Sequence, residues 1–190
     1  MCQFGVALAP DLILAAGSTA MAALQEATRT IPIVFVNFDP VGAGYVASLA
    51  RPGGNATGFM FVEYGVSPKW LELLKEIAPR TTRVAVLRDP TVAAGIGQLG
   101  GIQSVASSFG VVVSPMDVRD AGEIEQAVAT FARSGNGGLI VTANPMAIVH
   151  HGLITKLSAQ YRLPAVYFQR VFADVGGLSS YGPDPIDPYR

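Results

Sequence analysis

Ser18 and Thr19 are the first residues in this sequence whose types and spacing could do chemistry. They directly follow Gly17 at the end of an apolar run, and the next apolar run ends shortly before Asp39 and Pro40. Hydroxyl groups after a glycine turn can act as nucleophiles, cap a helix, or bind an anion together with free backbone N–H groups. A carboxylate followed by proline can meet a ligand ammonium group or cap a helix, and the proline favours the cap.

The residues around Ser18 do not support catalysis. A phosphate loop of the GxxxxGK[ST] type needs a lysine, which the segment Gly17-Ser18-Thr19 lacks. A nucleophile elbow of the GxSxG type needs a glycine two positions after the serine, where Ala20 stands. The sequence therefore favours a helix cap or a binding role here.

A second motif, Gly95-Ile96-Gly97-Gln98-Leu99-Gly100, matches the GxGxxG pattern of dinucleotide sites. It follows a predicted strand over 83–88, and Asp117 stands near the end of the next predicted strand, as a ribose-binding acid would. In such sites the first glycine directly follows the strand, whereas residues 89–94 intervene here. We expect a helix from near Ala93, with the glycines inside it for close packing. A nucleotide-dependent oxidoreductase using Gly95–Gly100 remains an alternative function.

The other reactive side chains form no recognisable metal or catalytic cluster. His150 and His151 are the only histidines, and adjacent helical residues point about 100° apart, unlike an i, i+4 pair of metal ligands. Cys2 is the only cysteine, which argues against a disulfide framework and a cysteine-based metal site. The carboxylates are scattered. We expect no enzymatic activity, no cofactor and no metal.

Composition restricts the class of partner. Of the 190 residues, 50% are hydrophobic and 14% are charged, with a net charge of −1, so the chain can bury a core and has no basic surface for nucleic acid. No segment approaches the roughly 20 apolar residues of a membrane span. The chain as given shows no signal peptide, so we expect either a cytoplasmic protein or one whose amino terminus has been removed.

Apolar β-rich runs alternate with helical patterns, which predicts right-handed βαβ units and a doubly wound α/β fold with parallel sheets. Strands are expected over 11–16, 31–37, 83–88, 111–116, 138–143 and 164–168, with weaker ones over 56–61 and 178–181. Helices are expected over 19–28, 67–77, 120–132 and 146–161. A loop-like break before residue 83 divides the chain into a partial lobe over 1–80 and a fuller lobe over 81–182.

Polar and aromatic residues gather at the carboxyl ends of the predicted strands. Ligands bind at that edge in open α/β sheets, so two facing lobes would hold a small amphiphilic ligand in a joint cleft. The competing explanation is that strand ends are polar because loops meet water. The residues concerned are Ser18-Thr19, Asn37 with Asp39, Arg88-Asp89, Asn144-Pro145 and Tyr167-Phe168-Gln169-Arg170.

The segment "DPVGAGYVASLARPGGNATG", residues 39–58, resembles a signature of ABC transporter substrate-binding proteins of the tryptophan or aromatic amino-acid type. Relatives read G-[ST]-x-A, then IPIVF, then DPVGAGLV-x-SLARPGGN-x-TG. The segments "LELLKEIAPRTTRVAVLRDP" and "GGLSSYGPDP" extend the resemblance over nearly the whole chain. The resemblance implies a type I periplasmic-binding fold, in which two hinged lobes close on a ligand without catalysis.

The resemblance also implies a site, a partner and a location. The protein would be periplasmic and would deliver a small ligand, an amino acid or related organic acid, to a membrane permease. A cytoplasmic ligand-sensing domain of the same fold is the alternative. Many relatives have Tyr-Asn where Leu87-Arg88 stands, so the arginine would meet a ligand carboxylate or face solvent. Ligand contacts would come from Ser18, Thr19, Asp39, Arg88, Asp89, Asn144, Tyr167 and Phe168, with Tyr181 at the hinge.

Comparison with that family's pattern suggests an incomplete first lobe. Relatives usually begin with an export signal and two further strands, and they continue into a helix that returns to the first lobe. Residues 183–190 would begin that returning segment. An incomplete lobe would expose apolar surface and a sheet edge, so we expect self-association into a homo-oligomer.

Overall fold

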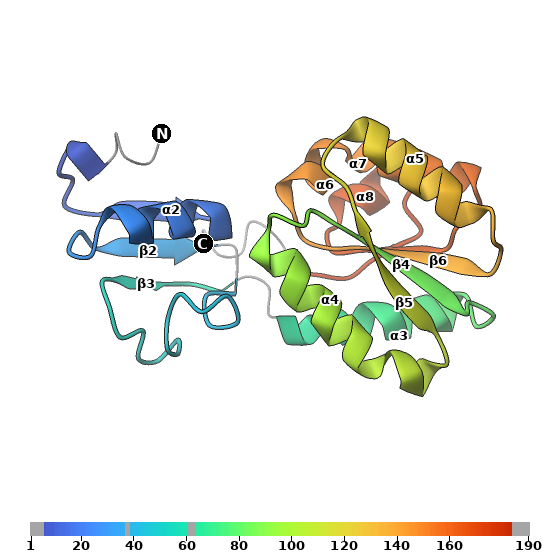
Figure 1. Ribbon diagram of the computed structural model, residues 1–190, viewed down its shortest axis with the longest axis horizontal. Helices are drawn as coiled ribbons and strands as arrows, with labels where there is room; N and C mark the ends of the chain where they lie inside the picture. Colours follow the sequence, from blue (N-terminus) through green and yellow to red (C-terminus); the bar gives the residue numbers. More distant parts are fainter. Residues whose placement is uncertain (1–5, 37–38, 61–63, 184–190) are drawn as a thin grey trace. The chain divides into compact units, whose positions relative to one another are not determined.

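The computed structural model describes residues 6–36, 39–60 and 64–183. They form two compact units, one ending at Tyr64 and the other starting at Gly65. Each unit has its own parallel sheet (Figure 1). Each also has its own hydrophobic core. The two units are therefore described separately.

The first unit contains a three-stranded parallel sheet in the order β1-β2-β3. Helix α2 connects β1 to β2 in a βαβ unit. All three strands are shorter than the predicted ranges, and Asn37, the expected end of the second strand, lies outside the described residues. The elements are β1 (Ile13–Ala16), α2 (Ser18–Ala27), β2 (Ile33–Val36) and β3 (Ala56–Gly58).

The core of the first unit lies between α2 and one face of the sheet. Met21 and Leu24, one turn apart on α2, are buried against Ile33 and Phe35 of β2. The i, i+3 spacing places both helical side chains on the same face, which is why this helix covers the sheet. The core is small, since α2 is the one helix longer than a few residues among the described part of this unit.

The second unit has a five-stranded sheet in the order β5-β4-β6-β7-β8, and every pair of neighbouring strands is parallel. This arrangement confirms the predicted doubly wound sheet. The elements are α3 (Ser67–Ile77), β4 (Arg83–Arg88), α4 (Ala93–Val105), η2 (Ala106–Phe109), β5 (Val112–Asp117), α5 (Ala121–Ala132), β6 (Gly137–Val141), α6 (Pro145–Val149), α7 (His151–Gln160), β7 (Ala165–Tyr167), α8 (Val171–Asp174) and β8 (Ser179–Ser180), preceded by a short 3-10 helix, η1 (Tyr64–Val66), at the boundary.

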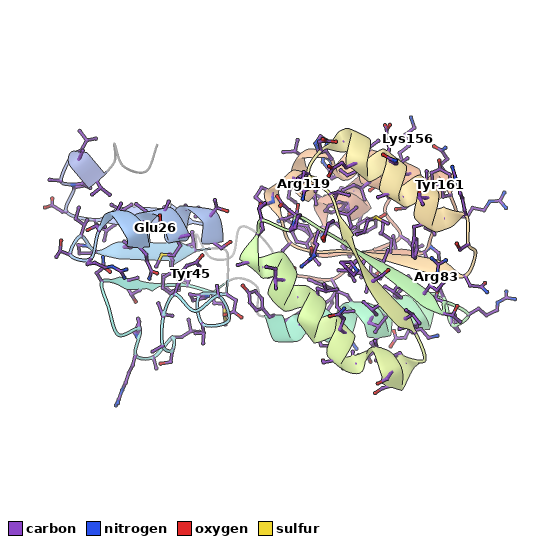
Figure 2. The ribbon with its side chains drawn as sticks, in the orientation of Figure 1. Glu26, Tyr45, Arg83, Arg119, Lys156 and Tyr161 are labelled. Carbon is purple, nitrogen blue, oxygen red and sulfur yellow. The ribbon has the colours of Figure 1, made fainter. Side chains whose placement is uncertain are left out.

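Helices cover both faces of this sheet. Helices α3 and α4 pack against each other on one side, and α5 and α7 pack against each other on the other side (Figure 1). Strand β6 is buried at every position, as expected for a central strand covered on both faces. Several charged side chains are exposed, including Glu26 on the first unit and Arg119 and Lys156 on the second (Figure 2).

The division between the units falls earlier than the expected position near residue 80. Helix α3 belongs to the second unit because Trp70, Leu71 and Leu74 are fully buried in its core. The indole Nε1 of Trp70 also donates a hydrogen bond to the backbone oxygen of Tyr181, 2.7 Å away. The apolar stripe of α3 was visible in the sequence, but which sheet it covers depends on tertiary packing.

One predicted helix differs in detail, and another is confirmed. The helix expected over 146–161 is two helices, α6 and α7, which meet at His150. The glycine segment lies inside α4, which begins at Ala93 as predicted. Of the segment expected to return to the first lobe, residues 184–190 lie outside the described part of the chain.

Candidate functional site

The start of α2 directly follows a turn at Gly17. Gly17 adopts φ 86°, a left-handed conformation that favours glycine, and its N–H donates to Val36 O at 3.0 Å. Gly17 is the N-cap, so the cap expected from Ser18 and Thr19 was placed one residue too late. Ser18 is buried and Thr19 is exposed, and no side chain caps this helix among the described residues. The first N–H groups of α2 are therefore available to an anion.

Asp39 is committed to its own turn. Its Oδ1 accepts the N–H groups of Val41 and Gly42 at 3.1 and 2.8 Å, and its Oδ2 accepts the Tyr64 N–H at 3.3 Å. The residues after Pro40 form turns and bends, so Asp39 organises a turn and does not cap a helix. This buried carboxylate shapes the end of β2.

Arg88 at the end of β4 pairs with Asp117 at the end of the neighbouring β5. The two distances are 2.6 Å from Nε to Oδ1 and 3.4 Å from Nη2 to Oδ2, and only 14% of the arginine side chain is exposed. The arginine was expected to meet a ligand carboxylate or to face solvent. Its guanidinium instead pairs with the Asp117 carboxylate. Asp117 is also the residue that a dinucleotide site would use to bind the ribose, and this ion pair already engages it.

Asp89 and Asn144 also serve their own loops. Asp89 Oδ1 accepts the N–H and the hydroxyl of Thr91 at 2.8 and 2.7 Å. Asn144 is the N-cap of α6, where its Oδ1 accepts the Ala147 N–H at 2.7 Å and its Nδ2 donates to Thr142 O at 3.0 Å. Both side chains therefore set the shape of the carboxyl edge.

The aromatic residues at the end of β7 lie inside the second unit. Tyr167 is 1% exposed, and its ring stacks on Phe172 of α8 with centroids 4.7 Å apart. Burial raises the pKa of the Tyr167 hydroxyl. Phe168 is also buried and meets Phe172 edge-on, whereas Tyr181 is exposed at 43%. The rings of Tyr167 and Phe168 therefore pack against α8 at the end of β7.

The glycine segment is a packing device. A Cβ added at Gly95 would lie 3.2 Å from Arg88 Cβ and 3.4 Å from Asp89 O, so the absence of a side chain lets α4 approach the end of β4 closely. The residue that sequence reasoning missed is Gln98 in the middle of this motif, an amide buried to 1% exposure. Its sequence signal was a polar residue on the face of α4 that also carries Gly95 and Leu99.

A groove of about 610 Å³ between β5 and α5 contains none of the expected ligand contacts, although Asp117 lines it. Arg83 also lines this groove (Figure 2). Its guanidinium stacks on Phe131, 4.7 Å from the ring centroid. His151 contacts Ile148 O through Nδ1, and no group of three metal-ligating side chains occurs among the described residues. Within the same residues, every helix is too short or too polar to cross a membrane.

Comparisons with solved structures identify the fold. A domain from Streptococcus pneumonia, solved in complex with L-Trp, matches with a TM-score of 0.88 at 23% identity, over 98% of this chain and 64% of that chain. A conserved domain protein from Vibrio cholerae O1 biovar eltor matches with a TM-score of 0.87 at 24% identity, over 96% and 61%. These similarities confirm the predicted type I periplasmic-binding fold.

Sequence comparisons identify the family. The tyrosine-binding protein of Clostridioides difficile (strain R20291) is 26% identical over 175 residues, which are 92% of this chain and 50% of that protein. The chain thus spans about half the length of this curated relative. A family profile described as ABC transporter substrate binding protein matches residues 3–187. Because the profile covers nearly the whole sequence, the chain belongs to the family of ABC transporter substrate-binding proteins.

Proposed function

We propose that this chain carries the ligand-binding edges of a solute-binding component of an ABC uptake transporter, and that the ligand is an amino acid or a related organic acid. The observation that carries the proposal is the uncapped start of α2, which follows the left-handed turn at Gly17. Family membership supports the class of function. One relative is named a tyrosine-binding protein and another was solved with L-Trp, which supports an aromatic amino acid as the ligand class.

The start of α2 suits the carboxylate of such a ligand. Its free N–H groups and the positive end of the helix dipole favour an anion, and the exposed Thr19 adds a hydroxyl donor. Ser18 lies beside it in the same turn. We assign Ser18 and Thr19 as direct contacts. Asp39, Asp89 and Asn144 hold the neighbouring turns in place, because their carboxylate or amide oxygens already accept backbone N–H groups.

At the edge of the second unit, the Asp89 carboxylate accepts groups of Thr91 in its own turn, and Arg88 is already paired. Arg88 and Asp117 neutralise each other, while Tyr167 and Phe168 are buried behind the strand end. Such an edge suits the uncharged body of a ligand better than a second ionic head. Because the glycine segment lies inside α4, its glycines do not form the turn between strand and helix that binds phosphate in a nucleotide-dependent enzyme. We therefore propose binding and release without catalysis, delivery to a membrane permease, and a periplasmic location.

Isothermal titration calorimetry with L-tryptophan, L-tyrosine and L-leucine tests the ligand class. Tryptamine, which lacks the carboxylate, tests the role assigned to α2. We expect at least one aromatic amino acid to bind and tryptamine to bind far more weakly than L-tryptophan. Tight binding of NAD(H), with no response to any amino acid, would overturn the proposal.

The double variant Ser18→Ala/Thr19→Ala tests the residues. Charge-assisted hydrogen bonds contribute about 1.5–3 kcal/mol each, so affinity should fall roughly tenfold or more. Thr28→Ala/Thr30→Ala at the opposite end of α2 is the matched control. It removes the Thr28 hydroxyl that accepts two backbone N–H groups, so stability should fall while affinity stays unchanged. Equal affinities in the wild type and the Ser18/Thr19 variant would refute the assignment.

A further inference from the structure

Gln98 is a buried amide that links α4 to the loop after β6. It is 1% exposed, and its Oε1 accepts the Ala143 N–H at 2.9 Å, across 45 positions in the sequence. Burying a glutamine is unfavourable unless its polar atoms are hydrogen-bonded, and an apolar residue of similar size would pack here without that cost. The hydrogen bond to Ala143 is therefore the feature that distinguishes Gln98 from a core residue.

The loop that Gln98 holds is otherwise fixed by its own hydrogen bonds. The N–H and the hydroxyl of Thr142 both donate to Leu87 O, at 3.1 and 2.9 Å. Asn144 donates to Thr142 O and accepts from Ala147 N. Ala143 lies between these two buried residues and is itself half-buried. Ala143 is thus the part of this loop that presents surface at the carboxyl edge of β6.

Gly95 explains how Gln98 reaches the loop. Position 98 follows position 95 by about one helical turn, so both residues lie on the same face of α4. Because Gly95 has no side chain, α4 lies close to the end of β4, where an added Cβ would be 3.7 Å from Thr142 Oγ1. The close approach brings the Gln98 amide against the neighbouring β6 loop. This gives the GxGxxG segment a role unrelated to phosphate binding.

We propose that Gln98 is a positioning residue, which holds the Thr142–Asn144 loop so that Ala143 faces the ligand. The role at the ligand rests on the proposed function, while the role at the loop stands on the hydrogen bonds alone. Gln98→Met removes the acceptor at similar volume, whereas Gln98→Glu keeps an oxygen that can accept the Ala143 N–H. Lys75→Met is the matched control, since it removes hydrogen bonds to Pro79 O and Thr81 O at the opposite edge of the sheet.

Amide hydrogen exchange by NMR tests the loop without a ligand. The Ala143 amide should exchange at least roughly tenfold faster in Gln98→Met, since its acceptor is gone, and should keep its protection in Gln98→Glu and Lys75→Met. The Leu139 amide inside β6 serves as the internal reference. Unchanged Ala143 protection in Gln98→Met would overturn the proposal. If that variant does not fold, Gly95→Ala is the second test, because moving α4 away should speed Ala143 exchange in the same direction.

Calorimetry with L-tryptophan and L-tyrosine tests the consequence for binding. Gln98→Met should bind roughly tenfold more weakly, while Gln98→Glu restores most of the affinity and Lys75→Met leaves it unchanged. An equal loss in Gln98→Met and Lys75→Met would show a general effect of stability and would overturn the positioning role. If the wild type binds neither amino acid, the proposed ligand class fails, and the Ala143 exchange rate still decides whether Gln98 holds the loop.

Discussion

Polar residues at the strand ends have two different roles at the residue scale. Asp39, Asp89 and Asn144 accept backbone N–H groups in their own turns, so their oxygens are already occupied. Thr19 lies exposed at an uncapped helix start. Residues of the first kind shape the carboxyl edges, and those of the second kind are available to a solute. Residue type alone does not separate the two roles.

Replacing Asp39 should therefore reduce stability more than binding. Asp39→Ala leaves three backbone N–H groups without their acceptor, and we expect the first unit to lose about 2–3 kcal/mol of unfolding free energy. Asp39→Asn keeps one oxygen and should lose less. Urea unfolding followed by circular dichroism measures both. A normal unfolding midpoint with lost L-tryptophan binding would instead identify Asp39 as a ligand contact.

Tyr64 should make the first unit sensitive to alkaline pH. Burial, followed by the nearby Asp39 and Tyr45, raises the pKa of Tyr64 to about 12 from 10.0. The pKa of Tyr64 is higher in the folded state than in the unfolded state. The contribution of protonated Tyr64 to the unfolding free energy is therefore complete below pH 10 and is lost as pH rises through about 12. Stability should fall more steeply over this interval in the wild type than in Tyr64→Phe. Thermal unfolding at several pH values, with absorbance at 295 nm to follow tyrosine ionisation, measures the difference.

At the scale of elements, the edge strands β1 and β5 differ in their protection. In β5 the N–H groups of Val112 and Val118 point toward β4. Successive N–H groups of a strand alternate between its two sides, so an N–H at position 115 would face away from β4. Pro115 stands at that position. Proline at that position costs no hydrogen bond and blocks pairing with another strand. In β1 the Ile13 N–H points toward β2, so Leu14 presents its N–H to the edge that no strand of the described residues pairs with.

The open edge of β1 makes self-association an expected property of this chain. Leu12 and Leu14 are 54% and 60% exposed beside that edge. Apolar side chains next to free backbone groups favour pairing with a second copy. Leu14→Lys should weaken association at least roughly tenfold, as measured by sedimentation velocity over a concentration series.

The matched control for this association is Val112→Lys, which places the same charge on the proline-protected β5, where Val112 is 71% exposed. It should associate as the wild type does. A wild type that stays monomeric at every concentration would contradict the expectation for β1.

At the scale of the whole molecule, the two units differ in their capacity to fold alone. The second unit has five strands with helices on both faces and a continuous core that includes Trp70, Ile102 and Leu139. The first unit has three strands and few core residues. Residues 65–183 expressed alone should therefore unfold cooperatively with a sigmoidal urea curve, because they include α3. Residues 81–183, which lack α3, are the control and should lose that cooperativity. Similar curves for the two would place α3 outside the second core.

Sequence alone determined the fold class, the family and the order of the elements. Alternating apolar runs and helical patterns are local properties, so strand β4 and helix α3 were predicted with the bounds that the structure shows. The parallel arrangement followed from the same alternation. Sequence also placed the glycine segment inside a helix, since residues 89–94 separate it from the strand.

Only the tertiary structure decided how the strand-end residues are used. The partner of Arg88 is Asp117, 29 positions away, and the partner of Gln98 lies 45 positions away, so no local pattern reveals either hydrogen bond. Tyr167 reads as a ligand-facing ring, but it is buried and stacks on Phe172, which the fold of α8 brings over the end of β7. The physical reason is that helix and strand periodicity are set by neighbouring residues, whereas burial and pairing of a side chain are set by groups that only folding brings together.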